Sequence, residues 1–454
     1  MGLKEDQVKG FRTMLPSKFV KYKFLEKKLQ NVAHKFGYNL IETPALELGE
    51  ILTKKGGLSP EQTEEIFMFK DHGDRWVGLR PDITTPIARV VSSGKFIGDY
   101  PLRWSYFTRV WRYEKPQAGR YREFWQYGVE SIGSDSFYSD FEVISLLCNQ
   151  YKELGFNKNN FRLKISHRNI LRGLIELSGI KDDDKITEVI RIIDKKDKIG
   201  LDNVILEIKE IVDESKLLKN IKSLFNSKKP FEFLEDISDK NEKLKSALIR
   251  LKDVDELIEE NNFKSLIEFD LSLARGFDYY TGIVFEAIVI DENENKVGGS
   301  IAGGGRYDKL VGLFGNRDTP CIGYGIGVDR TIEALIDLEN DEIKSISDSP
   351  LAHMIVYLKN SKLRNEAFKL LSKLHQENIN VTMTVDEYDS WGKMFKKEFK
   401  FADKKGAKFG IIIDEKSLKE GKYILKNLKK REQVELSEEE ILSKLKKNVD
   451  KNIF

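Results

Sequence analysis

Two spacings of apolar residues organise the first third of the chain. Residues 18–36 carry apolar side chains at helical spacing, which predicts an amphipathic helix that ends at Gly37. Residues 38–43 then form a run typical of a short strand, which Pro44 ends. A strand closed by proline favours a sheet edge or an interface over a central position in a sheet.

Alternating apolar and polar positions predict an antiparallel hairpin in the next part of the chain. Residues 105–113 alternate as a strand does, residues 115–120 read as a loop, and residues 123–130 return as a second strand. The loop contains lysine and arginine, so the predicted hairpin has a long basic tip.

Beyond residue 165 the pattern changes twice. Residues 165–263 are rich in lysine, aspartate, isoleucine and leucine and have almost no glycine or proline after Gly200, which predicts an inserted module of several helices. From residue 351 onward, predicted strands and helices alternate at 353–357, 363–376, 380–385, 391–405 and 409–413. That alternation predicts a small α/β domain with a parallel sheet.

Composition narrows the class of protein. The chain has 454 residues, of which 40% are apolar and 33% charged, so we expect a soluble protein of two or three domains. No run approaches the ~18 apolar residues of a membrane span, and residues 1–10 lack the apolar core of a signal peptide, so we expect a cytoplasmic location. Cys148 and Cys321 are far apart and support neither a disulfide framework nor a zinc site. We expect both to be small buried hydrophobic residues.

The charge is unevenly distributed along the chain. The formal net charge is +2, yet residues 351–454 alone carry 23 Lys and Arg against 16 Asp and Glu. A basic C-terminal module on a mildly acidic body suits an anionic partner, such as a nucleic acid. A solvated, lysine-rich surface would give the same count, so charge alone leaves both interpretations open.

The basic hairpin carries the first candidate chemistry. Arg112, Arg120 and Arg122 flank Glu114. Arginine presents a rigid fork to phosphate oxygens, a glutamate can accept a hydrogen bond from an exocyclic amine, and Phe124 could stack on a base. The set predicts a nucleotide-phosphate site, and a surface ladder of salt bridges is the alternative.

Two glycine-rich segments follow. Residues 298–308 contain a glycine run, which allows a ligand to approach the backbone but also occurs at plain strand bends. Residues 323–330 have the spacing Gly-x-Gly-x-Gly, which differs from the Gly-x-Gly-x-x-Gly of a dinucleotide site. It favours a strand that leaves room for a planar ligand, followed by Arg330, which can stack on that ligand. The sequence contains no P-loop, so ATP, if bound, is bound in another way.

Polar groups also gather at two further points. Residues 79–86 present Asp82 between two prolines, in a rigid loop that suits an ammonium group; a helix N-cap is the alternative. Residues 273–282 combine Arg275, two glycines, an acid and two adjacent phenols at the mouth of a predicted buried strand. Such groups either face a ligand or cap a turn.

Together these segments resemble the class II aminoacyl-tRNA synthetases, and within them the histidyl-tRNA synthetase family. The helix and strand that end at Pro44 look like the first motif of the class, residues 107–124 like the second, and residues 323–330 like the third. Residues 273–282 and 302–308 resemble two motifs specific to the histidine enzymes. The resemblance covers nearly the whole chain.

The resemblance implies an α+β fold in which an antiparallel-sheet catalytic domain is interrupted by a helical insertion and followed by an α/β anticodon-binding domain. The catalytic domain would span residues 1–165 and 266–345, the insertion residues 166–265, and the anticodon-binding domain residues 346–454. The implied partners are L-histidine, ATP, tRNA(His) and a second copy in a homodimer, with no membrane and no DNA.

The resemblance also implies a role for each matching position. Catalysis at the α-phosphate would fall to Arg112 and Arg275, and the implied ATP-binding residues are Arg112, Glu114, Arg120, Phe124 and Arg330. The implied histidine-binding residues are Asp82, Thr84 and Gln126 for the ammonium group, and Glu130, Tyr279 and Tyr280 for the imidazole pocket. Lys115 and Gln117 would meet the tRNA acceptor end, and Mg²⁺ would enter with ATP rather than in a protein-only site.

Elementary chemistry agrees with these implied roles. Neutral imidazole has one donor and one acceptor nitrogen, so a carboxylate facing a phenol selects it over isosteres. A site that pairs buried polar groups can reject analogues that lack them by ~10⁴-fold or more. Two arginines and Mg²⁺ would stabilise the charge that develops on the α-phosphate.

Some positions depart from the family pattern, and one rival function shares the fold. Lys115 stands where many members have arginine, Trp125 where many bacterial members have histidine, and Ile83 where leucine or glycine is common. The rival is a non-catalytic, histidine-binding regulatory paralogue, a kind of protein that usually loses the arginines or the C-terminal domain. This chain keeps Arg112 and Arg275 and has a basic C-terminal segment.

Overall fold

The structure is a computed structural model, and it describes residues 7–54, 60–95, 98–114, 120–212, 215–227, 229–273, 279–315, 317–346 and 349–448. The chain divides into two compact units. One consists of Met1–Met14 and Leu25–Lys344, and the other of Leu15–Phe24 and Ser345–Phe454. Among the described residues, no helix is both long enough and apolar enough to span a membrane.

The first unit is built on a large sheet, which has eight strands within the described residues. In spatial order the strands are β1 (Asn39–Leu40), β5 (Leu102–Trp111), β6 (Glu123–Ile132), β11 (Cys321–Gly327), β10 (Lys296–Arg306), β9 (Ile283–Ile290), β7 (Phe161–His167) and β8 (Ile267–Phe269). From β5 to β7 all neighbours are antiparallel, while the outermost strands β1 and β8 pair in parallel. The predicted antiparallel hairpin is confirmed as β5 and β6.

The N-terminal elements follow the expected order. The helix predicted over residues 18–36 is α1 (Pro16–Lys35), and Gly37 ends it with a φ of +81°, which glycine adopts without a steric penalty. The next strand is shorter than predicted, because only Asn39–Leu40 pair with β5. β1 is the last strand at its side of the sheet, which confirms the edge position that Pro44 indicated.

A small three-stranded sheet and several helices complete the frame around the large sheet. The small sheet consists of β2 (Leu46–Leu48), β4 (Trp76–Leu79) and β3 (Met68–Lys70). The helices of this part are α2 (Gly49–Leu52), α3 (Pro60–Glu64), α4 (Thr84–Ser92), α5 (Phe137–Glu153), α13 (Val328–Asp337) and α14 (Asp341–Ser345), with a 3-10 turn η2 (Val311–Phe314). α4 begins directly after the loop that carries Asp82, and α13 begins directly after β11.

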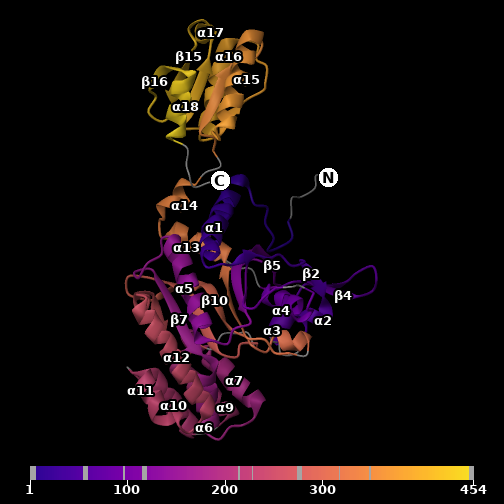
Figure 1. Ribbon diagram of the computed structural model, residues 1–454, viewed down its shortest axis with the longest axis vertical. Coiled ribbons are helices and arrows are strands. Elements are labelled where there is room, and N and C mark those ends of the chain that lie inside the picture. Colours follow the sequence, from indigo (N-terminus) through magenta and orange to yellow (C-terminus); the bar gives the residue numbers. More distant parts are fainter. Residues whose placement is uncertain are drawn as a thin grey trace. The chain divides into compact units, whose positions relative to one another are not determined.

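The helices predicted between residues 165 and 263 are present and lie between β7 and β8 in the chain. They are α6 (Arg168–Leu177), α7 (Asp183–Ile193), α8 (Lys196–Ile199), α9 (Leu201–Ile211), α10 (Ser215–Asn226), α11 (Pro230–Ser238) and α12 (Glu242–Glu260). They gather into one bundle at the end of this unit (Figure 1), and η1 (Lys264–Leu266) leads back into β8. Because β7 and β8 are neighbours in the sheet, the module can enter and leave at one place.

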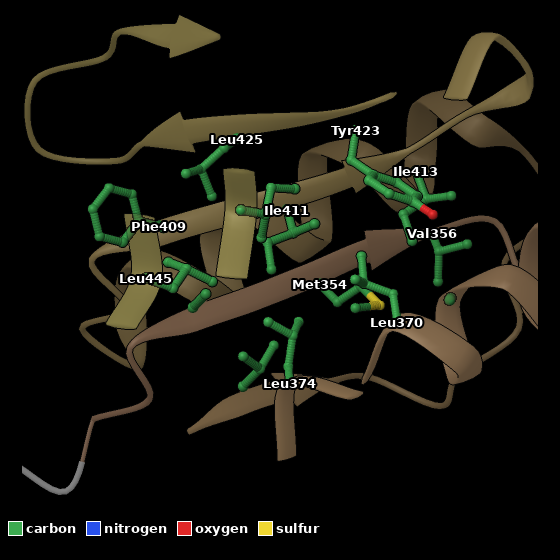
Figure 2. Close-up of a cluster of buried hydrophobic side chains, with 14 of the residues drawn as sticks. Met354, Val356, Leu370, Leu374, Phe409, Ile411, Ile413, Tyr423, Leu425 and Leu445 are labelled. Carbon is green, nitrogen blue, oxygen red and sulfur yellow. The ribbon is translucent and has the colours of Figure 1, made fainter. Parts of the chain in front are cut away.

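The C-terminal domain has a mixed sheet in the order β13-β12-β14-β15-β16. Its strands are β12 (Ala352–Val356), β13 (Val381–Met383), β14 (Phe409–Ile413), β15 (Lys422–Asn427) and β16 (Gln433–Ser437), and its helices α15 (Ser361–Gln376), α16 (Trp391–Lys404), α17 (Glu415–Glu420) and α18 (Glu438–Lys446). The prediction of a parallel sheet is right for β12, β13 and β14 but wrong for the sheet as a whole, because β15 and β16 are antiparallel. One face of this sheet packs against α15 and α18, with Met354, Leu370, Ile411 and Leu445 among the side chains that meet there (Figure 2).

Candidate active site

A cavity of about 300 Å³ lies over the glycine-rich strands of the large sheet. Its lining includes Gly303 of β10 and Gly323, Gly325 and Gly327 of β11, the last of which ends that strand. The structure brings together, along its walls, predicted site residues from segments far apart in sequence. These are Asp82, Thr84, Arg112, Glu114, Arg120, Phe124, Gln126, Tyr279, Tyr280 and Arg330.

The glycines of β11 leave room for polar side chains of the neighbouring strand β6. Gly323 pairs with Glu130 and Gly325 with Gly128 across the two strands. A Cβ atom at Gly323 would lie 1.8 Å from Glu130 Oε2, and one at Gly325 would lie 2.2 Å from Gln126 Nε2. Both positions therefore exclude a side chain, and the space goes to the carboxyl group of Glu130 and to the amide of Gln126, of which Gln126 lines the cavity.

Glu130 is buried and does not itself line the cavity, but two residues that do line it, Thr84 and Tyr307, hold its carboxyl group through their hydroxyl groups. Thr84 Oγ1 donates to Glu130 Oε1 at 2.7 Å, and Tyr307 Oη donates to Oε2. Burial raises the pKa of Glu130 to about 8, although both hydrogen bonds oppose that shift. A buried carboxyl group with ordered partners and a strongly raised pKa, beside a cavity, is typical of a functional site.

The two oxygens of Asp82 have different surroundings, which bear on the two roles that its sequence context left open, a helix N-cap and a contact with a ligand. Its Oδ1 accepts the backbone N–H of Thr85 at 2.9 Å, in the first turn of α4. Its Oδ2 is buried and has no hydrogen-bond partner among the residues that the structure describes. Burial raises the pKa of Asp82, and the nearby Arg112 acts in the opposite direction. One oxygen thus stabilises the helix start, while the other is available to a ligand in the cavity.

Aromatic side chains enclose the same end of the cavity. The rings of Tyr279 and Tyr280 meet edge to face with centroids 4.8 Å apart, and Tyr279 meets Tyr307 in the same way at 5.8 Å. All three are almost fully buried. Gln126 Nε2 donates to the hydroxyl of buried Tyr106 at 3.0 Å, which fixes the direction of its amide. The pocket is therefore narrow, mostly aromatic, and lined by a few oriented polar groups.

Positive charge gathers at the other end of the cavity, where the hairpin lies. The guanidinium of Arg112 is 5.4 Å from the centre of the Phe124 ring, and its Nε donates to the carbonyl oxygen of Pro81 at 2.9 Å. Glu114 lies between Arg112 and Arg120, with N–O distances of 3.9 and 3.4 Å. The Glu114 carboxylate thus holds the two guanidinium groups near one another. A bound ligand can replace these ion pairs or share the arginines with Glu114.

Two other arginines of the prediction differ in position. Arg330, at the start of α13, lines the cavity and donates to the carbonyl oxygen of Ser300 at 2.8 Å. Burial lowers its pKa, as does the charge of Arg120. Arg122 does not line the cavity, because its guanidinium lies 3.8 Å from the centre of the Tyr113 ring. Of the three arginines that flank Glu114 in the sequence, Arg112 and Arg120 line the cavity and Arg122 does not.

The cavity thus combines arginines of a hairpin, glycines of two strands and buried tyrosines. The family model described as histidyl-tRNA synthetase matches residues 10–331, and an anticodon binding domain model matches residues 353–448.

The chain belongs to the histidyl-tRNA synthetase family.

Relatives with curated functions match over nearly the whole length. The chain is 34% identical to a histidine–tRNA ligase of Pyrococcus furiosus, over 97% of this chain and 98% of that protein. It is 36% identical to a histidine–tRNA ligase of Methanococcus maripaludis, over 96% and 98% of the two chains. The fold is similar to the crystal structure of histidyl-tRNA synthetase from Nostoc sp. PCC 7120, with a TM-score of 0.82, 24% identity, and coverage of 99% and 100%.

The residues that border the cavity without a role assigned from the sequence include Tyr307, Asp329 and Glu286. Tyr307 lies within the glycine-rich segment 302–308 that resembles a histidyl-tRNA synthetase motif, so that motif could have drawn attention to it. Asp329 accepts the backbone N–H of Trp125 at 3.0 Å and pairs with Arg12. Glu286, in the middle of β9, gives no local signal beyond its charge.

A magnesium ion that accompanies ATP fits the donor set of this cavity. Mg²⁺ is usually held by one or two carboxylates together with substrate phosphates. Glu114 and Glu286 provide carboxylates on the cavity wall. Within the described part of the chain, no group of three or more His, Cys, Asp or Glu side chains could hold a metal ion. The residues thus suit a metal that the nucleotide brings.

Three predicted site residues lie outside the described residues. They are Arg275, Lys115 and Gln117. The two cysteines are buried and free, in agreement with the prediction that they are small core residues.

Proposed function

We propose that this chain joins L-histidine to tRNA(His) in an ATP-dependent reaction that passes through a histidyl-adenylate. The observation that carries the proposal is one cavity that Tyr279, Tyr280 and Tyr307 border at one end and Arg112, Glu114 and Arg120 at the other, with Glu130 buried behind it and bound by the Tyr307 hydroxyl. An amino-acid pocket joined to a basic nucleotide site is what adenylation of an amino acid requires.

Histidine occupies the aromatic end of the cavity in this proposal. Its ammonium group meets the buried Oδ2 of Asp82, together with Thr84 and Gln126, because a buried carboxylate oxygen without a partner is a strong site for a cation. The imidazole ring lies among the tyrosines, where Glu130 and Tyr280 bind its two nitrogens and Tyr279 packs on the ring. One acceptor and one donor match neutral imidazole.

ATP occupies the basic end of the cavity. Glu114 accepts from the adenine amine, while Phe124 and Arg330 enclose the ring and Arg120 meets the phosphates. A histidine carboxylate oxygen attacks the α-phosphorus, the bond to the bridging oxygen breaks, and pyrophosphate leaves. Arg112, joined by Arg275, stabilises the negative charge on the α-phosphate oxygens. Mg²⁺ bound with ATP would neutralise phosphate charge.

Transfer to tRNA completes the proposed reaction. A hydroxyl of the terminal adenosine attacks the adenylate carbonyl, and AMP leaves. Lys115 and Gln117 meet the acceptor end, residues 166–265 form an insertion domain near the acceptor arm, and residues 346–454 bind the anticodon. The catalytic domain is then formed by residues 1–165 and 266–345. The match of the anticodon binding domain model to residues 353–448 and the excess of basic residues after residue 351 support this division.

We also propose a cytoplasmic homodimer. Apolar side chains are exposed on the small sheet and the nearby edge strand, which suits an interface between two copies. They are Leu40, Leu46, Leu48, Phe69 and Trp76. Light scattering on the purified chain should give twice the monomer mass of 52.5 kDa, and a monomer at micromolar concentration would contradict the proposal.

The first half-reaction is tested by exchange of labelled pyrophosphate into ATP, with each amino acid in turn. We expect exchange with histidine and none above background with the others. Equal exchange with a second amino acid would exclude the proposed specificity. Histidine binding without exchange would favour the regulatory paralogue instead, although Arg112 and Arg330 at the cavity argue against it.

A further inference from the structure

A buried carboxylate joins the helical module to the sheet that carries the histidine pocket. Asp140 of α5 is fully buried, and two arginines bind its two oxygens. Arg306 of β10 donates to Oδ1 from Nε at 2.9 Å and from Nη2 at 2.6 Å. Arg250 of α12, the last helix of the module, donates to Oδ2 from Nε at 2.5 Å. Both oxygens are therefore in use, one by the sheet and one by the module.

The guanidinium group of Arg306 makes further hydrogen bonds besides those to Asp140. Its Nη1 donates to the carbonyl oxygen of Ser134 at 3.0 Å and to Asp308 at 3.0 Å, and its Nη2 donates to Ser139 Oγ at 2.8 Å. A Cβ at Gly282 would lie 3.0 Å from Arg306 Cδ, so glycine at that position leaves room for the side chain. An arginine with this many charge-assisted hydrogen bonds has one well-defined position.

The backbone around Arg306 carries the phenols of the pocket. Its carbonyl oxygen accepts the N–H of Thr281 at 2.7 Å, and Thr281 directly follows Tyr280. The residue after Arg306 is Tyr307, whose hydroxyl donates to Glu130. Fixing Arg306 therefore fixes the backbone next to Tyr280 and Tyr307, two tyrosines that line the cavity.

The first helix of the module is attached to the same segment. The backbone N–H of Arg168, where α6 begins, donates to the carbonyl oxygen of Gly282 at 3.0 Å. Buried His167 caps that helix by accepting the N–H of Asn169 at 3.2 Å. The module is thus tied at both of its ends to residues next to Tyr280 and Tyr307.

We propose that Arg250 is a positioning residue for histidine: through Asp140 and Arg306, the helical module holds Tyr280 and Tyr307 at the distance that the imidazole requires. This inference rests on the proposed function. Arg250 touches neither substrate in this arrangement, and its effect is confined to the amino-acid end of the cavity, because the basic end is built on the hairpin of β5 and β6.

The expected effect of Arg250→Ala depends on the contacts of Asp140 that remain after the substitution. Asp140 keeps both bonds from Arg306, and the Arg250 side chain is 21% exposed, so water can reach the vacated oxygen and the fold should persist. The loss of one anchor loosens the strand that carries Tyr307. We expect the KM for histidine in pyrophosphate exchange to rise about 5-fold or more, with kcat and the KM for ATP within about 2-fold of wild type.

Arg172→Ala provides a matched control within the same module. Arg172 also pairs with two carboxylates, Glu176 and Asp183, and none of these three residues is among the described residues that line the cavity. Its KM for histidine should equal that of wild type. Arg250→Lys keeps the charge and should fall between wild type and Arg250→Ala, as a rescue by the conservative variant.

The experiment measures exchange kinetics for wild type, Arg250→Ala, Arg250→Lys and Arg172→Ala. Exchange by wild type tests the proposed function separately, so its failure is not confused with failure of this inference. An unchanged histidine KM in Arg250→Ala, a parallel rise in the KM for ATP, or an equal effect of Arg172→Ala would overturn the inference. If Arg250→Ala does not fold, Arg250→Lys and Arg250→Gln decide, and equal histidine KM values in these and wild type would overturn it.

Discussion

Glu130→Gln should remove a pH dependence from the stability of the chain. Burial raises the pKa of Glu130 from 4.5 to about 8, whereas in the unfolded chain the side chain is solvated and titrates near its ordinary value. Between these two values the native state holds one proton that the unfolded state has lost. The free energy of unfolding therefore falls as the pH rises through this window, and the contribution is fully present only below about pH 4.5.

The size of the effect follows from linkage. One proton of difference corresponds to about 1.4 kcal/mol per pH unit, so Glu130 should lower the free energy of unfolding by about 2 kcal/mol between pH 6 and pH 8. Glutamine has nearly the same shape and does not titrate, so the variant should lack this component. Asp82 also has a pKa raised by burial, but it is present in both proteins and largely cancels in the comparison.

Urea unfolding at several pH values measures this difference. The chain has five tryptophans, and only Trp391 lies in the C-terminal unit, so a Trp391→Phe background makes fluorescence report on the unit with the cavity. We expect the free energies of unfolding of the Glu130 and Glu130→Gln proteins to differ least near pH 5 and to separate as the pH rises toward 8, because only the Glu130 protein loses stability over this range. Parallel curves across that range would show that Glu130 titrates normally and would refute the account of its burial.

Three further predictions concern the proposed reaction. Gly323→Ala places a Cβ 1.8 Å from Glu130 Oε2, so histidine-dependent exchange should fall by about 100-fold or more while ATP binding, followed by fluorescence titration, changes little; normal exchange would mean that Glu130 is not needed. Arg275→Ala should slow adenylate formation in single-turnover experiments by on the order of 10²–10³, with a weaker effect on histidine affinity, and an unchanged rate would remove Arg275 from the mechanism. Deletion of residues 351–454 should preserve exchange but weaken charging of tRNA; unchanged charging would contradict the role of the C-terminal domain.

The large sheet and its hairpin could be predicted because their patterns are local. The alternation across residues 105–113 and 123–130 follows from one strand face being buried and the other meeting solvent or ligand. The glycine spacing of β11 was visible in the sequence as well, but its cause lies in another strand, because Gly323 and Gly325 leave room for Glu130 and Gln126 of β6. The edge position of β1 follows from Pro44, which has no N–H to offer a neighbouring strand.

The polar contacts that complete the pocket could not be predicted in this way. Tyr307 reaches Glu130 across 177 positions of sequence, and Arg250 and Arg306 reach Asp140 across 110 and 166. No periodicity in a single sequence reports such a pair, because each partner alone resembles an ordinary surface or core residue. Resemblance to a family supplied the roles of Glu130 and Tyr280, but not the hydroxyl groups that hold the carboxylate.

The C-terminal sheet shows a different limit of prediction from the sequence. β15 and β16 were not predicted, although Tyr423 and Leu425 alternate with polar residues in the way that a half-buried strand requires. The preceding alternation of strands and helices favoured a wholly parallel sheet. The antiparallel pair depends instead on a short connection between residues 427 and 433, which returns the chain directly along its neighbour.

Charging of a tRNA(His) transcript with labelled histidine tests the central claim most directly. With ATP and Mg²⁺, the purified chain should convert the transcript to histidyl-tRNA, and omission of ATP or substitution of another amino acid should abolish the product. Histidine binding without any charged tRNA, under conditions in which a known histidyl-tRNA synthetase charges the same transcript, would contradict the account.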